Sequence, residues 1–267
     1  MKLIVLLLIV GVFTLNVQAG QDSTICNPVA GETEVINYSP ELAKQAVSGD
    51  VNAQYKVGLC YYFGLHVKDD VKEAVKWFRM AAEMGHVKAQ RYLADSYRDG
   101  RDVERNDKED FKWRTKAAEQ GDAIAQCTLG QKYRVGDFVQ KDEKEALKWF
   151  EKAAAQGETI AQVELGDFYR KGIVVQKNEV EAVKWYSKAT ELREGESRED
   201  AYQNEQSHGA GYCSLGECYE NGIGVPKDEK KALEYYRKAV ELWWHPAKPL
   251  LEKLERRMNN SESRVAR

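Results

Sequence analysis

The chain has 267 residues, of which 43% are hydrophobic and 31% are charged, and this composition is typical of a folded protein. Its 40 Lys and Arg residues nearly balance its 43 Asp and Glu residues, so the formal net charge is −3. Because sequence-independent binding to nucleic acid needs a surplus of basic residues, nucleic acid is excluded as an expected partner.

The N-terminus has the layout of a secretory signal peptide. Lys2 precedes an unbroken apolar run over 3–13, and the small residue Ala19 supplies a cleavage position. We therefore expect a signal peptide over 1–19, a secreted or periplasmic mature protein, and a flexible leader over 20–39. The alternative is an uncleaved membrane anchor, but the apolar run is short for a transmembrane helix and no second stretch is long enough to span a bilayer.

A repeat with a spacing of 36 residues occupies the body of the chain. Four of the six tryptophans follow it, and alanine, aliphatic, tyrosine and glycine positions keep the same step. These positions are Trp77, Trp113, Trp149 and Trp185; Ala53, Ala89, Ala125 and Ala161; Val57, Leu93, Leu129 and Leu165; Tyr61, Tyr97, Tyr133 and Tyr169; and Gly64, Gly100, Gly136 and Gly172. A fifth copy continues at Leu215, whose offset from Leu165 is 50 rather than 36, so about 14 residues are inserted.

Each copy is expected to form two helices. In the third copy Ala125, Leu129 and Tyr133 are four residues apart and form one apolar stripe, and Gly136 ends that helix. Asp142 then provides an N-cap for the second helix, with Glu three residues later. The same signal recurs at Asp70, Asn106, Asn178 and Asp228. One helix pair cannot bury its stripe alone, so the copies are expected to stack into a solenoid.

The solenoid is expected to occupy residues 40–258. It begins with a half-repeat helix near Pro40, and Trp243 and Trp244 are expected to bury against a C-terminal cap. The expected segments are repeats near 53–88, 89–124, 125–160, 161–210 and 211–246, a capping helix over 247–258 and a disordered tail over 259–267. The charged insertion around 193–209 is either a loop for recognition or a solvated spacer.

These positions together carry a family resemblance. The pattern Ala-x-x-x-Leu-Gly-x-x-Tyr-x-x-Gly, then Val-x-x-(Asp/Asn), then Ala-x-x-Trp-(Phe/Tyr)-x-x-Ala-Ala resembles the Sel-1-like repeat, a relative of the tetratricopeptide repeat, and residues 125–160 match almost throughout. The resemblance implies an all-α fold, an α/α superhelix of about five helix–turn–helix repeats with half-repeat caps. It also implies a non-catalytic adaptor or scaffold that binds a protein or peptide on the concave face lined by the first helices.

The second copy departs from this pattern at two positions. Asp110 stands where the other copies have alanine, and Arg114 stands where they have an aromatic residue. The two residues are four apart on a helix and can therefore pair. They are either an ion pair at a looser contact between repeats or a contact for a partner.

Three arginines share one repeat position, directly after the tyrosine of the first helix: Arg98, Arg134 and Arg170. Stacked repeats would align them as a basic row that suits an acidic or carboxylate-bearing peptide. Alternatively, Asp95 and Asp167 lie three residues before two of these arginines and neutralise them locally.

The five cysteines do not show the regular pairs that bridge helices in a cysteine-rich group of relatives. Cys26 in the leader could reach Cys60, and an odd count leaves at least one thiol free or bonded to another chain. Cys213 and Cys218 are five apart on an expected helix and point in different directions, so no bridge is expected between them.

No motif in the sequence indicates catalysis, a cofactor or a metal. The chain has no Ser-x-x-Lys, no His-Glu-x-x-His and no phosphate-binding loop, and the spacing of His208, Cys213 and Cys218 is not a standard zinc pattern. The leading hypothesis is therefore a non-enzymatic adaptor. The alternatives are an envelope enzyme or binder acting on β-lactam or peptidoglycan, as in the cysteine-rich relatives, and a structural stabiliser of a membrane complex.

Overall fold

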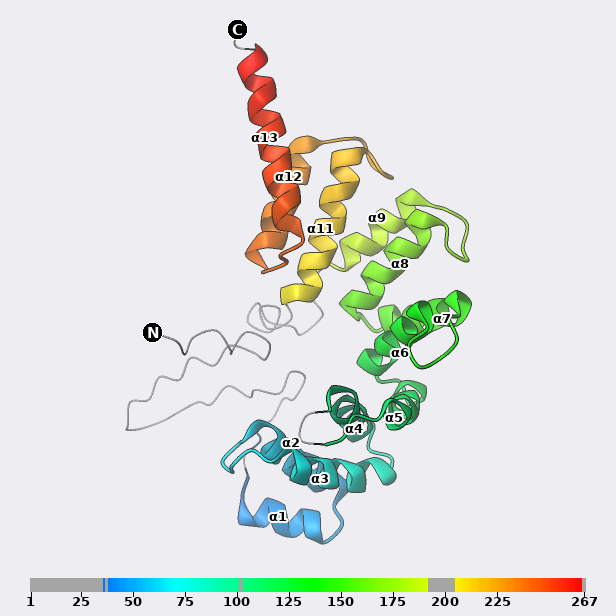
Figure 1. Ribbon diagram of the computed structural model, residues 1–267, viewed down its shortest axis with the longest axis vertical. Coiled ribbons are helices and arrows are strands. Elements are labelled where there is room, and N and C mark those ends of the chain that lie inside the picture. Colours follow the sequence, from blue (N-terminus) through cyan, green and yellow to red (C-terminus); the bar gives the residue numbers. More distant parts are fainter. Residues whose placement is uncertain (1–35, 37, 101–102, 192–204, 266–267) are drawn as a thin grey trace, which may run out of the picture. The chain divides into compact units, whose positions relative to one another are not determined.

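The computed structural model describes residues 36, 38–100, 103–191 and 205–265, and the secondary structure of this part is entirely helical (Figure 1). The helices are α1 (Pro40–Val47), α2 (Val51–Phe63), α3 (Val71–Glu83), α4 (Val87–Asp99), α5 (Asp107–Glu119), α6 (Ala123–Val135), α7 (Glu143–Ala155), α8 (Thr159–Lys171), α9 (Glu179–Lys188), α11 (Glu205–Asn221), α12 (Glu229–Glu241) and α13 (Ala247–Val265). The expected signal peptide, nearly all of the leader and most of the insertion lie outside the described residues.

The helix limits follow the predicted capping residues. The side chains of Asp70, Asn106, Asp142, Asn178 and Asp228 each accept a hydrogen bond from the backbone N–H three residues later, at the starts of α3, α5, α7, α9 and α12. The first helices α2, α4, α6 and α8 end at glycines with φ between 63° and 81°. A residue with a Cβ is disfavoured in this left-handed conformation, so glycine is the residue suited to these ends.

Helices that are consecutive in the chain pack against each other from α1 to α9 and from α11 to α13 (Figure 1). Beyond the insertion, α11 packs against both α8 and α9, so the fifth copy stacks on the fourth. The alanines of the repeat, such as Ala125 and Ala161, are fully buried at these contacts. The all-α repeat superhelix is therefore confirmed, with first helices α2, α4, α6, α8 and α11 and second helices α3, α5, α7, α9 and α12.

Glycine allows a close contact inside four of the five copies. A Cβ added at Gly130 in α6 would lie 2.8 Å from an aromatic carbon of Phe150 in α7, too close for real side chains. Gly58, Gly166 and Gly216 face the rings of Phe78, Tyr186 and Tyr236 in the same way. Only in the second copy does alanine, Ala94, take this glycine position, and there Arg114 replaces the ring.

Two expectations at the C-terminus need correction. Helix α13 continues to Val265, so residues 259–265 are helical rather than disordered. Extending an existing helix avoids the cost of nucleation, which explains why a polar segment can follow the cap in helical form.

Trp244 packs against a cluster with Ala247 and Leu254 as expected, but Trp243 is exposed in a left-handed turn (φ 55°). Consecutive turn residues point in different directions, so only one of the two indoles contacts the cap.

No helix in the described part of the chain combines the length and the apolar character needed to cross a membrane.

We predict that Gly130→Ala destabilises the protein. On an exposed helix alanine would stabilise by about 1 kcal/mol relative to glycine. Here the new Cβ meets the Phe150 ring, and overpacking costs about 1–3 kcal/mol, so the thermal unfolding temperature should fall. Ala94→Gly is the control at the equivalent position, where Arg114 stands in place of the ring; because Ala94 is fully buried, the change should cost helix propensity and the burial of one methyl group, with no overpacking. An unfolding temperature of Gly130→Ala equal to or above that of the wild type would contradict the packing described here.

Candidate binding surface

The three arginines expected to form a basic row lie on α4, α6 and α8. Their side chains are 44%, 36% and 23% exposed for Arg98, Arg134 and Arg170, respectively. Each therefore keeps part of its surface open to solvent while the remainder contacts the protein.

All three arginines pair with carboxylates of the same chain. Arg98 lies 3.4 Å from Asp95 and Arg170 lies 3.5 Å from Asp167, so the local pairing predicted as the alternative is confirmed. The arginine row, Arg98, Arg134 and Arg170, is thus largely neutralised from within the chain.

Two further pairs join consecutive copies and were not predicted. Arg134 lies 2.7 Å from Glu164 on α8, and Arg170 lies 2.8 Å from Glu217 on α11. Burial raises the pKa of the Glu164 carboxyl, while the positive charge of Arg134 opposes that rise. These partners lie in the next copy, and no local spacing rule in the sequence identifies them.

Asp110 and Arg114 are fully buried and form an internal ion pair. Arg114 Nη2 lies 2.6 Å from Asp110 Oδ1 and 3.0 Å from Asp95 Oδ1. Lys132 Nζ lies 2.9 Å from Asp110 Oδ2 and 2.8 Å from Asp137. This charge cluster ties α4, α5 and α6 together. Neither Asp110 nor Arg114 is accessible to a partner in this structure, so the alternative of a direct partner contact is not supported.

Sequence reasoning missed Lys132, although a signal was present. Lysine stands at a first-helix position that holds Cys60, Ser96, Phe168 and Cys218 in the other copies. A buried lysine at a core position requires a counter-charge, and the unusual acid of the second copy, Asp110, provides it.

A row of buried glutamines was also missed. Gln54, Gln90, Gln126 and Gln162 directly follow the repeated alanines of the first helices, and each Nε2 donates to an alanine carbonyl of the preceding second-type helix. In two copies a further glutamine completes the contact, because Gln120 Nε2 donates to Gln90 Oε1 at 2.7 Å and Gln156 Nε2 donates to Gln126 Oε1 at 2.8 Å. The repeated Ala-Gln dipeptide was the available signal.

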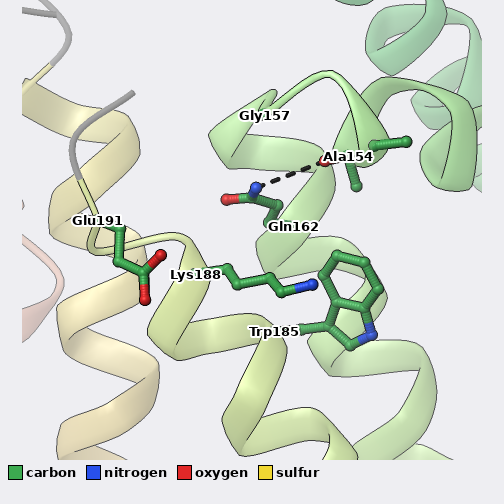
Figure 2. Close-up of a pocket in the computed structure, with 7 residues that line it drawn as sticks. Ala154, Gly157, Gln162, Trp185, Lys188 and Glu191 are labelled. Carbon is green, nitrogen blue, oxygen red and sulfur yellow. Dashed lines mark hydrogen bonds between the residues drawn. The ribbon is translucent and has the colours of Figure 1, made fainter. Parts of the chain in front are cut away.

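The last member of this glutamine row lines a shallow pocket of about 280 Å³. Figure 2 shows Gln162 bonded to the Ala154 carbonyl, with the Lys188 ammonium over the ring of Trp185. Glu191 forms the opposite side, at the edge of the described residues. The pocket is polar and open, and its shape does not enclose a small molecule.

His208, Cys213 and Cys218, whose spacing was compared with a zinc site, are buried in the core at the start of the fifth copy. His208 is buried, and its Nδ1 lies 3.0 Å from the Ala189 carbonyl oxygen. Cys60, Cys127, Cys213 and Cys218 are buried, and none of them forms a disulfide with another described residue. Cys26 lies outside the described residues, so its pairing with Cys60 stays a prediction.

We predict that Arg114→Ala is strongly destabilising, because it removes the main counter-charge of the buried Asp110 carboxylate. Breaking one partner of a buried pair costs about 3–5 kcal/mol. The matched control is the combined variant Ala94→Gly, Asp110→Ala, Arg114→Phe, Lys132→Cys, which copies the glycine, alanine and ring of the other repeats and replaces the buried lysine by the cysteine found at its position in the first and fifth copies. It should be as stable as the wild type or more stable, since apolar packing commonly equals a buried ion pair. Urea unfolding followed by circular dichroism compares the three proteins, and a mild effect of Arg114→Ala would contradict the assignment.

We also predict that the native protein resists alkylation at four cysteines. Burial raises the pKa of the Cys60 thiol to about 11 and those of Cys213 and Cys218 to about 12, and it raises the pKa of Cys127 as well. A raised pKa keeps the thiol protonated at neutral pH, and only the thiolate reacts readily. Intact mass after alkylation should show these sites modified only upon unfolding. If Cys26 bridges Cys60, both remain unmodified in the unfolded chain until a reductant is added, whereas rapid modification of any of the four in the native protein would contradict the burial.

Comparison with known proteins supports the repeat assignment. A family model described as Sel1 repeat matches residues 51–86, 87–122, 123–158, 159–193 and 209–242. Its first copy begins at 51 rather than at the expected 53, and the gap before 209 coincides with the insertion. A search of the curated proteins finds no match.

Solved structures of similar sequence share the fold. A Sel1 repeat protein from Oxalobacter formigenes is 31% identical with a TM-score of 0.68, over 80% of this chain and 77% of that one. A protective antigen present in uropathogenic Escherichia coli strains, which displays an SLR fold, is 34% identical with a TM-score of 0.66. That alignment covers 79% of this chain and 43% of the antigen, so this chain corresponds to less than half of that protein. The capped helix pairs, the glycine–aromatic contacts and the five matched copies together show that the chain belongs to the Sel1 repeat family.

Proposed function

We propose that this protein is an exported, non-catalytic adaptor that binds an acidic protein or peptide through the face of its first helices. Sel1 repeat proteins generally mediate protein–protein interactions, and the repeat is typically a non-catalytic scaffold. The observation that carries the finer proposal is the arginine row, which places one partly exposed guanidinium at the same position of α4, α6 and α8.

The internal carboxylate partners of these arginines are compatible with binding. A partly exposed ion pair contributes only about 0–1 kcal/mol, so a carboxylate of a partner can replace an internal one at little cost. Guanidinium groups also have several donors, and one side chain can contact two carboxylates at once. Arg170 already does so with Asp167 and Glu217.

Export is supported by the expected signal peptide over 1–19 and by relatives with this repeat, which are often extracellular or periplasmic. The alternative of an envelope enzyme or binder acting on β-lactam rested on the cysteine-rich relatives. In the described part of this chain Cys60, Cys127, Cys213 and Cys218 are free rather than bridged, which favours the adaptor.

The test begins by crosslinking the mature chain in the exported fraction and identifying the captured partner by mass spectrometry. Replacing Arg98, Arg134 and Arg170 together by alanine should weaken binding to that partner about ten-fold or more, if each contact contributes about 0.5–1 kcal/mol. It should also reduce the dependence of the affinity on salt.

The matched control removes the same charge from the second helices. Lys76, Lys148 and Lys184 are exposed on α3, α7 and α9 and pair with Glu residues three positions earlier. Their combined replacement by alanine should leave the affinity unchanged. Equal losses in the two triple variants would refute a specific role for the arginine row, and covalent labelling or turnover of a β-lactam would favour the enzyme instead.

A further inference from the structure

Arg134 differs from the other two members of the arginine row in the number of carboxylates that hold it. Those two arginines each contact two carboxylates, Asp95 and Asp99 for one and Asp167 and Glu217 for the other. Arg134 has Gln131 three residues before it in place of an aspartate, and within the described residues its one ion pair is with Glu164 of α8, at 2.7 Å. The middle position of the row therefore depends on a single carboxylate.

Glu164 is also the least exposed of these five carboxylates. Its side chain is 12% exposed, whereas the other four are 19–43% exposed. The charged and titratable groups that act on it are Arg134 and Cys127 of α6 and Asp167 and Lys171 of its own helix. Because Lys171 is paired with Asp167, Arg134 is the cation that compensates the charge of Glu164.

A partner carboxylate that binds Arg134 takes this guanidinium away from Glu164. A largely buried carboxylate without its counter-charge is unfavourable, and such a group takes up a proton instead. Burial already raises the pKa of Glu164 and the charge of Arg134 opposes that rise, so the loss of Arg134 raises this pKa further. The aspartates beside the other two arginines keep a second cation when their arginine is withdrawn, Arg114 in one case and Lys171 in the other.

We propose that Glu164 competes with the partner's carboxylate for Arg134 and gives way by taking up a proton from solvent, so that the arginine row binds its acidic partner more tightly in a mildly acidic medium than at neutral pH. This inference rests on the proposed function and adds its regulation by pH. Binding and protonation are reciprocal: if the bound partner favours protonated Glu164, protonation of Glu164 favours the partner by the same factor. The gain in affinity is therefore absent well above the pKa of Glu164 and grows as the pH falls through it. It ends at about pH 4, where the partner's own carboxylates become protonated.

The probe is a synthetic peptide of six glutamates with blocked ends, and its affinity is measured at about pH 5 and about pH 7.5. Its carboxyls, with a pKa of about 4.3, stay mostly ionised at both values, and their partial protonation would only weaken binding at the lower pH. Glu164→Gln removes the titrating group and leaves Arg134 without a charged partner at both values. It should bind the peptide about two- to five-fold more tightly than the wild type at the higher pH, the effect of one partly exposed contact, and equally at the lower pH.

Glu217→Gln is the matched control for this variant. It removes the same charge beside the row, but Arg170 keeps Asp167 as a partner and the Glu217 side chain is more exposed than that of Glu164. This variant should therefore keep the pH dependence of the wild type. Protonation of histidines acts alike on all three proteins and cancels in the comparison. Equal pH dependence in the wild type and Glu164→Gln would overturn the proposal.

A second measurement needs no peptide. Titration of the ¹³C-labelled glutamate carboxyls by NMR, with Glu164 assigned from the spectrum of Glu164→Gln, reports the pKa of Glu164 directly. Arg134→Ala withdraws the guanidinium as a bound partner would, so it should raise this pKa above the wild-type value. An unchanged or lower pKa of Glu164 in Arg134→Ala would show that Arg134 does not hold the carboxylate and would also overturn the proposal.

The arginine triple variant separates this inference from the proposed function. If the wild type binds the peptide no better than the triple variant at either pH, the arginine row does not bind acidic peptides, and both proposals are wrong. If the wild type binds better than the triple variant but shows the same pH dependence as Glu164→Gln, the proposed function stands and the role of Glu164 alone is wrong.

Discussion

Each helix pair of this protein buries its apolar stripe only against neighbouring pairs. This mutual burial limits the size and the polarity of the side chain that fits at each repeat position. Ala125 and Ala161 are fully buried where helices cross, and small residues allow the helices to approach closely. The ring of Phe150 lies against the backbone of Gly130, where even a Cβ does not fit. Four of the five copies repeat this contact, and a change in one of its residues requires a compensating change in the other.

The second copy shows such a compensation. Arg114 replaces the ring, Ala94 replaces the glycine that the ring requires, and Asp110 and Lys132 supply the charges that a buried guanidinium and its neighbours need. A buried ion pair is seldom more stable than the apolar packing it replaces. The charged cluster therefore does not make the contact between these copies more stable than the apolar contacts of the other copies. It links three consecutive helices by ion pairs in place of apolar packing.

The arginine row and the glutamine row each hold one residue type at equivalent positions of several copies. The arginine row occupies first helices, where partly exposed guanidinium groups pair with acids of the same and the next copy. Beside the glutamine row, Met84 of the first copy interrupts a pattern that Gln120 and Gln156 complete in later copies. In both cases the repeat gives residues at equivalent positions the same surroundings. A different residue type in one copy therefore changes the contacts made at that position.

The sequence by itself determined the helices, their limits and the repeat, because capping residues such as Asp142 and stripes such as Ala125 and Leu129 act over a single turn or helix. It also identified Asp110 and Arg114 as a pair and the local partners of Arg98 and Arg170. Only the tertiary structure decided that Asp110 and Arg114 are buried, that Glu164 neutralises Arg134, and that the glutamines of the repeat bond to the preceding helix. Burial and pairing across copies depend on residues that are distant in the chain, and their positions follow from how the helices stack rather than from any local spacing.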